Sequence, residues 1–566
     1  MPRTAALITL SIIIPLVTAM APCPLFGPDL PIPSAMSEIL QLLNPDVAGG
    51  TQSIHMDFQN TSFSIDVYST VEQKPLINHH HAALSMEWHE RGTHTVNDTT
   101  IYRIGSISKL LTAYLYLIEV GDTSFSEPIT QYVPELAALP AKKQGSAIQE
   151  VDWDVITIGA LASHMAGIPR DPPRPATKDL ELAQLGFPPV NPTHLTYCGE
   201  GGLYPCNRSA FFDSIRPSHP VEVPFSTPIY SNVGYQILGY ALENITGSTY
   251  SSILSHQLIL PLRLNSTTYA RPDNAGSSII PNDSGTVWYD VNTGDAGPAA
   301  GVYSSIADLR RIGRSILTYE LLSPAQTRRW MKPVTFTADP HVAVGAPWEI
   351  AKAPSTSGRA SWMYTKGGQI GSYNSLVALL PDWGVGITVL AAGSNSAGVT
   401  GVLPGLIASK LVPALEEAAK TQANLTYGGH YGSRESNMTI AVDSNLPGLG
   451  VTSWFHNGHD MFDSIRSMIT GPGTSNGPGH VSMRLYRTGL ETYSCRREKK
   501  ESWRAVYEVL DPASPPASRC VSWFSVDSVT YGGESIDEFV FDLVENGVAQ
   551  GLTVSAFDSH LIKVAQ

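Results

Sequence analysis

The sequence has few charged residues for its length and no long basic run. Charged side chains make up 15% of the 566 residues, and the formal net charge is −14. A negative chain without a basic cluster has little to attract phosphates or anionic lipid headgroups. We therefore expect neither nucleic acid nor a membrane as a partner. The hydrophobic content of 42% is that of a globular protein, and the oligomeric state is left open.

Cysteine is also scarce, with five residues and no Cys-x-x-Cys pair. That spacing is typical of structural zinc and redox sites, so neither is expected. The run His79-His80-His81 is more typical of a surface loop than of a metal site, because adjacent histidines rarely point the same way. No His-Glu-x-x-His occurs. We predict neither a metal nor an organic cofactor.

The amino terminus has the pattern of a secretory signal over residues 1–19. Arg3 precedes an apolar run from Ala5 to Val17, and cleavage is expected after Ala19. Eight Asn-x-Ser/Thr sequons agree with export and predict N-glycosylation. Their asparagines are Asn60, Asn97, Asn207, Asn244, Asn265, Asn282, Asn424 and Asn437. We therefore predict a secreted, extracellular glycoprotein from a eukaryotic host.

The cysteines fit the oxidising compartment that export implies. Cys198 and Cys206 are close together within one loop, and Cys495 and Cys520 flank one predicted strand pair. We predict that these two pairs form disulfides, and we assign no disulfide partner to Cys23.

The length favours two domains rather than one. Up to about residue 420, strand-like and helix-like stretches are mixed. Beyond it the pattern changes to short strands and turns, with Asn546-Gly547 as a hairpin signal. We predict a first domain over residues 20–420 and a β-rich domain over residues 421–566, as an antiparallel barrel or sandwich.

The segment Ser106 to Val120 is apolar almost all round and contains no Pro or Gly, which predicts a buried helix closed by Gly121. Ser106 and Lys109 are three residues apart, so their side chains lie on one face. Ser106 is also in the first turn, where the helix dipole favours developing negative charge. A buried lysine loses proton affinity and could take the serine proton. The alternative is a serine cap with an unrelated lysine.

Two further motifs favour the catalytic interpretation. Tyr230-Ser231-Asn232 is the only Tyr-x-Asn, and Lys366-Gly367-Gly368 is a Lys-x-Gly followed by a strand-like run. The order Ser-x-x-Lys, Tyr-x-Asn, Lys-x-Gly resembles the serine β-lactamase and penicillin-binding-protein superfamily, in particular its class C branch, which includes esterases and D-aminopeptidases. The segments His164 to Pro169 and Ala300 to Ser305 add to the resemblance.

The resemblance implies a β-lactamase/transpeptidase-like α/β (α+β) fold, with a central antiparallel sheet flanked by helices. The C-terminal region resembles the lipocalin-like domain of some family members. Strands are expected at residues 63–68, 82–88, 375–380 and 385–390, and helices at 232–246, 305–318 and 401–420.

The resemblance also implies roles for the motif residues. Ser106 would be the nucleophile that forms an acyl-enzyme, with Lys109 and Tyr230 as proton carriers, and either of the two could be the general base. Asn232 would hydrogen-bond the substrate or Lys109. Lys366 and Gly368 would line the substrate site, and the N–H groups of Ser106 and Gln369 would form the oxyanion hole.

These roles predict a secreted serine hydrolase acting on a small ester or amide. An acyltransferase acting on a secreted metabolite and a non-catalytic binding protein are the alternatives. The Pro-rich and Gly-rich region from Pro169 to Pro228 is expected to be a lid tied by Cys198–Cys206. Gly367 stands where the β-lactamase branch usually has Thr or Ser, so a β-lactam or a D-Ala-D-Ala peptide is not the expected substrate.

Overall fold

The computed structural model describes residues 30–31, 59–88, 90–139, 147–172, 184–188, 206–281, 288–354, 360–471, 480–493, 499–510, 522–545 and 547–564. The predicted signal segment, residues 1–19, lies outside them. The chain forms two compact units and passes from the larger to the C-terminal unit between Leu415 and Glu416. The sequence placed the domain boundary after residue 420, and that boundary stays a prediction.

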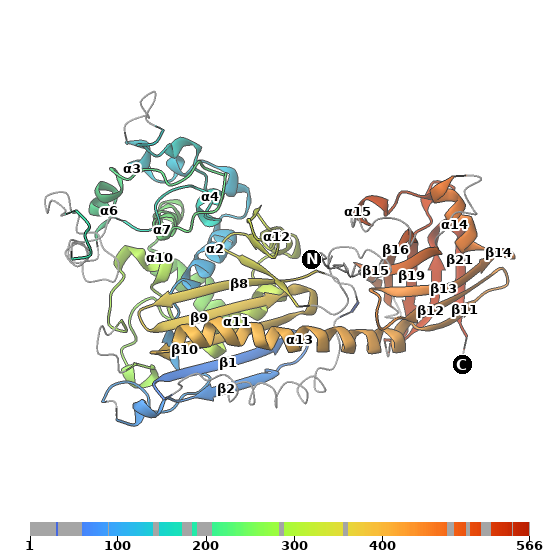
Figure 1. Cartoon of the computed structure of the whole chain (residues 1–566), viewed down its shortest axis with the longest axis horizontal. Helices are drawn as coiled ribbons and strands as arrows, with labels where there is room; N and C mark the ends of the chain where they lie inside the picture. Colours follow the sequence, from blue (N-terminus) through green and yellow to red (C-terminus); the bar gives the residue numbers. More distant parts are fainter. Residues whose placement is uncertain are drawn as a thin grey trace, which may run out of the picture. The chain divides into compact units, whose positions relative to one another are not determined.

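An eight-stranded antiparallel sheet forms the centre of the larger unit, in the order β2-β1-β10-β9-β8-β7-β6-β5 (Figure 1). The predicted central antiparallel sheet is therefore confirmed. Its strands are β1 (Thr61–Ser69), β2 (Ile77–His81), β5 (Thr335–Phe336), β6 (Val342–Val344), β7 (Glu349–Ala353), β8 (Ser361–Ile370), β9 (Tyr373–Leu380) and β10 (Val385–Gly393).

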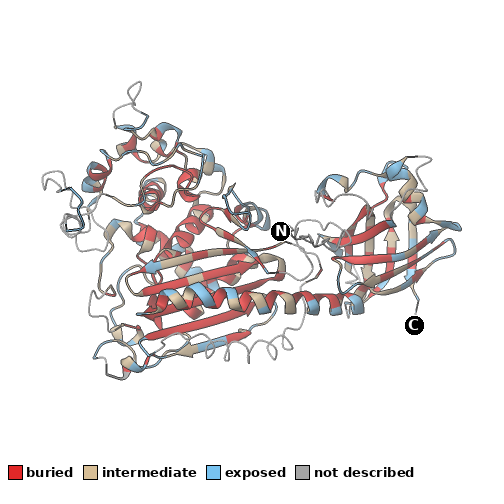
Figure 2. Ribbon diagram, viewed as in Figure 1, coloured by how far each residue is buried: buried red, intermediate tan, exposed pale blue. Residues whose placement is uncertain are grey.

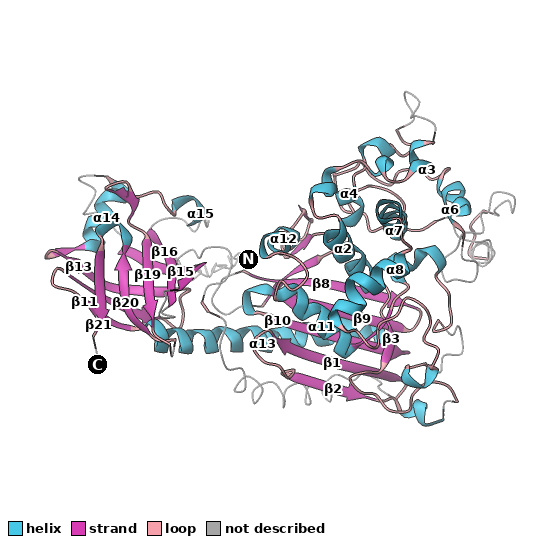
Figure 3. Ribbon diagram, turned by 180° about the vertical axis from the view of Figure 1, so that it is seen from behind, coloured by secondary structure: helices cyan, strands magenta, loops and turns pink. Residues whose placement is uncertain are grey.

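Helices cover both faces of this sheet. Helices α2 (Ile107–Glu119) and α11 (Ile306–Leu317) pack on one face, and the first half of α13 (Ser396–Tyr427) lies on the other (Figures 1 and 3). Every residue of β1 and β10 is consequently buried, including the polar residues of β1 (Figure 2). Arg310 of α11 donates to the buried Asp66 of β1 at 2.6 Å, which ties the helix to the sheet.

The remaining helices stand mostly beyond the β8 side of α2. They are α3 (Pro134–Ala137), α4 (Ile158–Ala162), α6 (Arg208–Ile215), α7 (Asn232–Thr246), α8 (Tyr250–Leu254), α9 (Leu260–Leu262), α10 (Gly297–Ala300) and α12 (Pro324–Trp330). A two-stranded pair, β3 (Ile101–Arg103) with β4 (Tyr303–Ser305), leads into α2 and α11. Helix α7 packs on α2, α4 and α10, so the residues at its start lie beside the start of α2.

Two sequence expectations about the first strands differ from the structure. Residues 82–88 are not a strand, because Leu84–Trp88 forms a 3₁₀ turn. The strand lies earlier, at Ile77–His81, so His79-His80-His81 belong to the edge strand β2 rather than to a loop. Within the predicted lid, Arg208–Ile215 is helical; its other described parts carry no strand.

Helix α13 is longer than the predicted helix over residues 401–420. It runs for 32 residues from Ser396 to Tyr427 and accommodates Pro404 and Pro413 in its interior. Its length and hydropathy would suit a membrane span, but Leu403, Ile407 and Leu411 are buried within the protein, as in a soluble core helix. Tertiary packing therefore offsets the low helix propensity of the two prolines.

The C-terminal unit is a closed antiparallel barrel of eight strands, in the order β12-β11-β21-β20-β19-β16-β15-β13, closed by the β12–β13 pairing. Their bounds are β11 (Gly429–Gly432), β12 (Ser436–Val442), β13 (Leu449–His456), β15 (His480–Tyr493), β16 (Lys499–Leu510), β19 (Glu538–Leu543), β20 (Ala549–Val554) and β21 (Ser559–Lys563). Of the two predicted alternatives, barrel and sandwich, the barrel is confirmed, and the hairpin signal falls between β19 and β20.

Candidate active site

Ser106 stands at the turn from β3 into α2, where the backbone changes direction at Gly105. Gly105 has φ +50°, a conformation that favours glycine. Ser106 is the residue before the first helical turn, yet its side chain makes no capping hydrogen bond. Its Oγ instead accepts hydrogen bonds from Lys109 Nζ at 3.0 Å and from Tyr230 OH at 2.6 Å. The serine-cap alternative is therefore not the arrangement found.

Lys109 is completely buried and faces three acceptors. Besides Ser106 Oγ, its Nζ donates to Asn232 Oδ1 at 2.6 Å and to the Ala299 carbonyl of α10 at 2.9 Å. Burial, reinforced by the nearby positive charge of Lys366, lowers the pKa of Lys109 well below its usual value. A neutral amine could keep its two N–H bonds to Asn232 and Ala299 and present its lone pair to the Ser106 hydroxyl. The geometry therefore suits a lysine that receives the serine proton.

The amide of Asn232 is oriented by a carboxylate that the motif analysis did not identify. Asn232 Nδ2 donates to Asp171 Oδ1 at 2.6 Å, and a carboxylate can only accept. The amide oxygen must therefore face Lys109. Asn232 opens α7, which is capped by the Ser231 Oγ accepting from the Gly234 N–H. Asp171 thus holds Asn232 in the orientation that binds Lys109.

Tyr230 is held by His164, which lies in the segment linking α4 to the predicted lid. The His164 carbonyl accepts from the Ile229 N–H at 2.8 Å, and its Nδ1 accepts from the Ser231 N–H at 3.1 Å. The imidazole also lies against the Tyr230 ring, with centroids 4.5 Å apart. Both neighbours of Tyr230 in the chain, and its ring, are therefore fixed by one residue.

Lys366 lies on β8 with its ammonium 5.3 Å from the centre of the Tyr230 ring. Its Nζ donates to Glu349 Oε1 of the neighbouring strand β7 at 2.6 Å and to the Gly367 carbonyl at 2.8 Å. The other Glu349 oxygen accepts from the Gly367 N–H at 2.9 Å. The lysine of the third motif is therefore already paired with a carboxylate of the chain.

The two backbone segments predicted to form the oxyanion hole lie side by side. A Cβ added to Gly105 would be 2.7 Å from the Gln369 nitrogen, and one added to Gly368 would be 2.1 Å from the Ile104 carbonyl oxygen. Only glycine permits this approach at positions 105 and 368. The peptide before Ser106 therefore runs along the backbone around Gln369, as a shared anion site for the two N–H groups would require.

The structure thus brings Ser106, Lys109, Tyr230, Asn232 and Lys366 into one site. The motif analysis assigned no role to Asp171, Glu349 or His164. A conspicuous local signal existed only for His164, within the segment that resembles the family. Asp171 and Glu349 acquire their partners through strand and loop pairing, which the local sequence does not encode.

The predicted disulfides and sequons fall only partly within the described residues. Cys206 is disulfide-bonded, while Cys198, Cys495, Cys520 and Cys23 lie outside the described residues, so both pairings stay predictions. Asn282 also lies outside them. The other sequon asparagines are all exposed: Asn60, Asn97, Asn207, Asn244, Asn265, Asn424 and Asn437.

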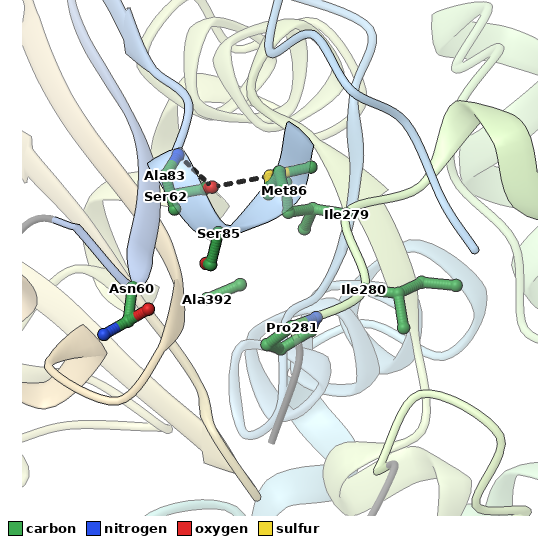
Figure 4. Close-up of a pocket in the computed structure, with 9 residues that line it drawn as sticks. All are labelled: Asn60, Ser62, Ala83, Ser85, Met86, Ile279, Ile280, Pro281 and Ala392. Atoms are coloured by element: carbon green, nitrogen blue, oxygen red, sulfur yellow. Dashed lines mark hydrogen bonds between the residues drawn. The ribbon is translucent and has the colours of Figure 1, made fainter. Parts of the chain in front are cut away.

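A small pocket lies beside β1. It is bordered by Ser62, Met86 and Ile280, with room for about one water molecule in roughly 10 Å³ (Figure 4). Ser62 Oγ accepts from the Ala83 N–H and donates to Met86 Sδ, each at 2.8 Å. None of the site residues lines it. In the described part of the chain, no group of three or more His, Cys, Asp or Glu residues could hold a metal.

Comparisons with known proteins agree with this arrangement. A profile of the beta-lactamase family matches residues 79–411, and one described as "Beta-lactamase-like-like, C-terminal domain" matches residues 419–565. A "Beta-lactamase-like protein" of Arthroderma benhamiae is 29% identical over 92% of this chain and 90% of its own length. "Probable hydrolase M10" of a Phoma species is 27% identical over 95% and 91%.

A more distant relative is a "D-alanyl-D-alanine-carboxypeptidase/endopeptidase" of Escherichia coli, 23% identical over 52% of this chain and 71% of its own length. The family match covers more than half of the chain and includes all three motifs. The chain therefore belongs to the beta-lactamase family of serine hydrolases and carries the family's barrel-like C-terminal domain.

Proposed function

We propose that this protein is a secreted serine hydrolase that forms an acyl-enzyme at Ser106 and cleaves small, uncharged esters. The observation that carries the proposal is the pair of hydrogen bonds from Lys109 and Tyr230 to the Ser106 Oγ. A serine with two proton carriers at hydrogen-bond distance is the arrangement that nucleophilic catalysis needs.

The reaction would proceed in two balanced steps. The Ser106 Oγ adds to the ester carbonyl carbon while its proton passes to the Lys109–Tyr230 pair, which then protonates the leaving alcohol. Water next attacks the acyl-enzyme and returns Ser106 with its proton, releasing the acid. The N–H groups of Ser106 and Gln369 stabilise the oxyanion of each tetrahedral intermediate. Because burial lowers the pKa of Lys109, a neutral amine is accessible to start the first step.

Esters are favoured over β-lactams and D-alanyl peptides because those substrates carry a carboxylate. The Escherichia coli relative is named for D-alanyl-D-alanine. In this chain the residue after Lys366 is Gly367, so the hydroxyl that would bind a substrate carboxylate is absent. Losing one hydrogen bond to a charged group costs about 1.5–3 kcal/mol, or one to two decades in affinity.

The test is a panel of aryl esters, D-amino amides and β-lactams on purified protein and on Ser106→Ala. A small aryl ester should be the best substrate, and a fluorophosphonate should label Ser106 in the wild type alone. Clear hydrolysis by Ser106→Ala would contradict the mechanism, and cephalosporin turnover at an equal or higher kcat/KM would contradict the ester assignment. Product analysis with an added alcohol separates hydrolysis from the alternative, acyl transfer.

A further inference from the structure

The Glu349 carboxylate binds the Lys366 ammonium in the way that a substrate carboxylate would. Glu349 lies on β7, opposite Thr365 of β8, and its side chain reaches Lys366 and Gly367 of that strand. Its two oxygens bind two different donors, the Lys366 ammonium at 2.6 Å and the Gly367 N–H at 2.9 Å. A carboxylate held by a lysine and a strand N–H has the binding mode expected of an anionic ligand.

The burial of the two partners is unequal. The Lys366 side chain is 1% exposed, whereas that of Glu349 is 46% exposed. A buried ammonium is stable only with a counterion and hydrogen-bond partners. Glu349 supplies the counterion from the solvent side, and the Gly367 carbonyl takes a second N–H. The lysine charge is consequently neutralised before any substrate arrives.

A second cation beside Tyr230, the exposed Arg170, also has an acidic neighbour. The Arg170 guanidinium lies 4.8 Å from the centre of the Tyr230 ring and 3.5 Å from Asp171. Both of these cations, Lys366 and Arg170, therefore stand next to a carboxylate. An incoming carboxylate would meet negative charge at both positions.

We propose that Glu349 is a specificity-determining residue, which makes the site accept acyl groups that are uncharged next to Lys366 and reject those that carry a carboxylate there. This inference rests on the proposed ester hydrolase function. To bind at Lys366, a substrate carboxylate must displace Glu349 or lie beside it. Repulsion between like charges a few ångströms apart in a partly exposed site lowers affinity by about tenfold or more.

The direct test compares two aryl esters of similar acyl length, one with a terminal methyl group and one with a terminal carboxylate. The wild type should prefer the neutral ester at least tenfold in kcat/KM. Glu349→Gln removes the charge but keeps an oxygen that can accept the Gly367 N–H. In this variant the ratio of kcat/KM for the neutral ester to kcat/KM for the charged ester should fall by about tenfold.

A matched control is Glu320→Gln, which removes another half-exposed glutamate from a cation, Arg311, at 2.7 Å. Its ester preference should equal that of the wild type. Glu349→Ala provides a second charge-removing change, and each variant is judged by its ratio of the two ester activities, which a general loss of activity does not alter. An unaltered preference in Glu349→Gln and Glu349→Ala, with both enzymes active, would overturn the inference.

A binding measurement separates this inference from the proposed function. Phenylacetate should raise the Tm of Glu349→Gln but not that of the wild type. The uncharged phenylacetamide should change the Tm of both proteins by the same amount. If the wild type cleaves no ester, the proposed function fails, and this comparison alone decides the role of Glu349. Equal responses of the two proteins to phenylacetate would overturn it.

Discussion

His164 has an unusual backbone for a buried residue, with φ +61° in the left-handed region. In that conformation the His164 carbonyl accepts a hydrogen bond from Ile229 and the His164 ring accepts one from Ser231, the two neighbours of Tyr230 in the chain. Since Nδ1 accepts from the Ser231 N–H, the proton of the neutral ring is on Nε2, which has no hydrogen-bond partner among the described residues. A buried nitrogen without a hydrogen-bond partner and a strained backbone both cost folding free energy. Such costs are tolerated where a residue positions a functional group, so we interpret His164 as a positioning residue.

Replacing His164 should therefore slow catalysis without weakening substrate binding. His164→Ala loses both the Nδ1 acceptor and the contact with the Tyr230 ring, so kcat should fall about 100-fold with little change in KM. His164→Asn keeps an acceptor for the Ser231 N–H and tolerates the left-handed backbone, so it should recover part of the loss. Steady-state kinetics on an aryl ester checks both, and equal kcat values for the two variants would contradict the positioning role.

The same residue should make stability depend on pH. Burial and the nearby charges of Lys109, Lys366 and Arg170 lower the pKa of folded His164 well below 6.5. As the pH falls, the unfolded chain therefore binds a proton to this histidine at a higher pH than the folded chain does. The contribution of His164 to the free energy of unfolding is complete above pH 6.5. Below pH 6.5 it is lost by up to about 1.4 kcal/mol per pH unit. Urea unfolding at pH 7.5 and 5.5 should show a smaller loss for His164→Asn than for the wild type. The exposed His219→Asn is the control and should behave as the wild type does.

The placement of single residues in one site was predictable where short motifs carry them. Ser106 and Lys109 share a helix face, and Tyr230 and Asn232 flank a helix cap, so their local spacing already places them. Asp171 and Glu349 were not predictable, because their partners lie 61 and 17 positions away in sequence and meet them only through the tertiary fold.

At the level of elements, the approach of β8 to the start of α2 requires a glycine on the strand, at position 368. A Cβ at Gly368 would lie 2.1 Å from the Ile104 carbonyl oxygen and 3.0 Å from the Ile107 nitrogen. Gly368→Ala should displace the strand from the Ser106 turn, lower kcat/KM at least 100-fold and cost about 1–3 kcal/mol of stability. Gly367→Ala is the matched control, since its nearest neighbour would be Glu349 Oε2 at an ordinary 3.4 Å. Kinetics and urea unfolding of both variants test this, and an active Gly368→Ala enzyme would be incompatible with it.

Elements with strong end signals agree with the sequence predictions. Helix α7 spans the predicted residues 232–246, because Ser231 caps its start and Gly247 ends it at φ +68°. The strand predicted at residues 82–88 was wrong because a short run of mixed character fits a 3₁₀ turn as well as an edge strand. The full length of α13 was not predictable, because Pro404 and Pro413 oppose a helix that packing then stabilises.

For the molecule as a whole, export should leave covalent marks. All seven sequon asparagines in the described residues are exposed, so several should carry glycans in material secreted by a eukaryotic host. Enzymatic deglycosylation converts an occupied Asn to Asp, which peptide mass mapping detects. Non-reducing mapping of the same digest should yield Cys198–Cys206 and Cys495–Cys520. A digest without any converted asparagine, or with Cys198 as a free thiol, would contradict this prediction.

The order of strands in the central sheet has a consequence for biosynthesis. β1 pairs along its whole length with β10, which is made about 330 residues later. The sheet therefore cannot be completed while the chain emerges, although the segment of α2 that carries Ser106 and Lys109 is translated early. The Lys366 charge that helps to lower the pKa of Lys109 is carried by β8, which is translated long after α2. We therefore expect the nascent chain to be chemically inert toward esters until nearly all of the larger unit has been synthesised.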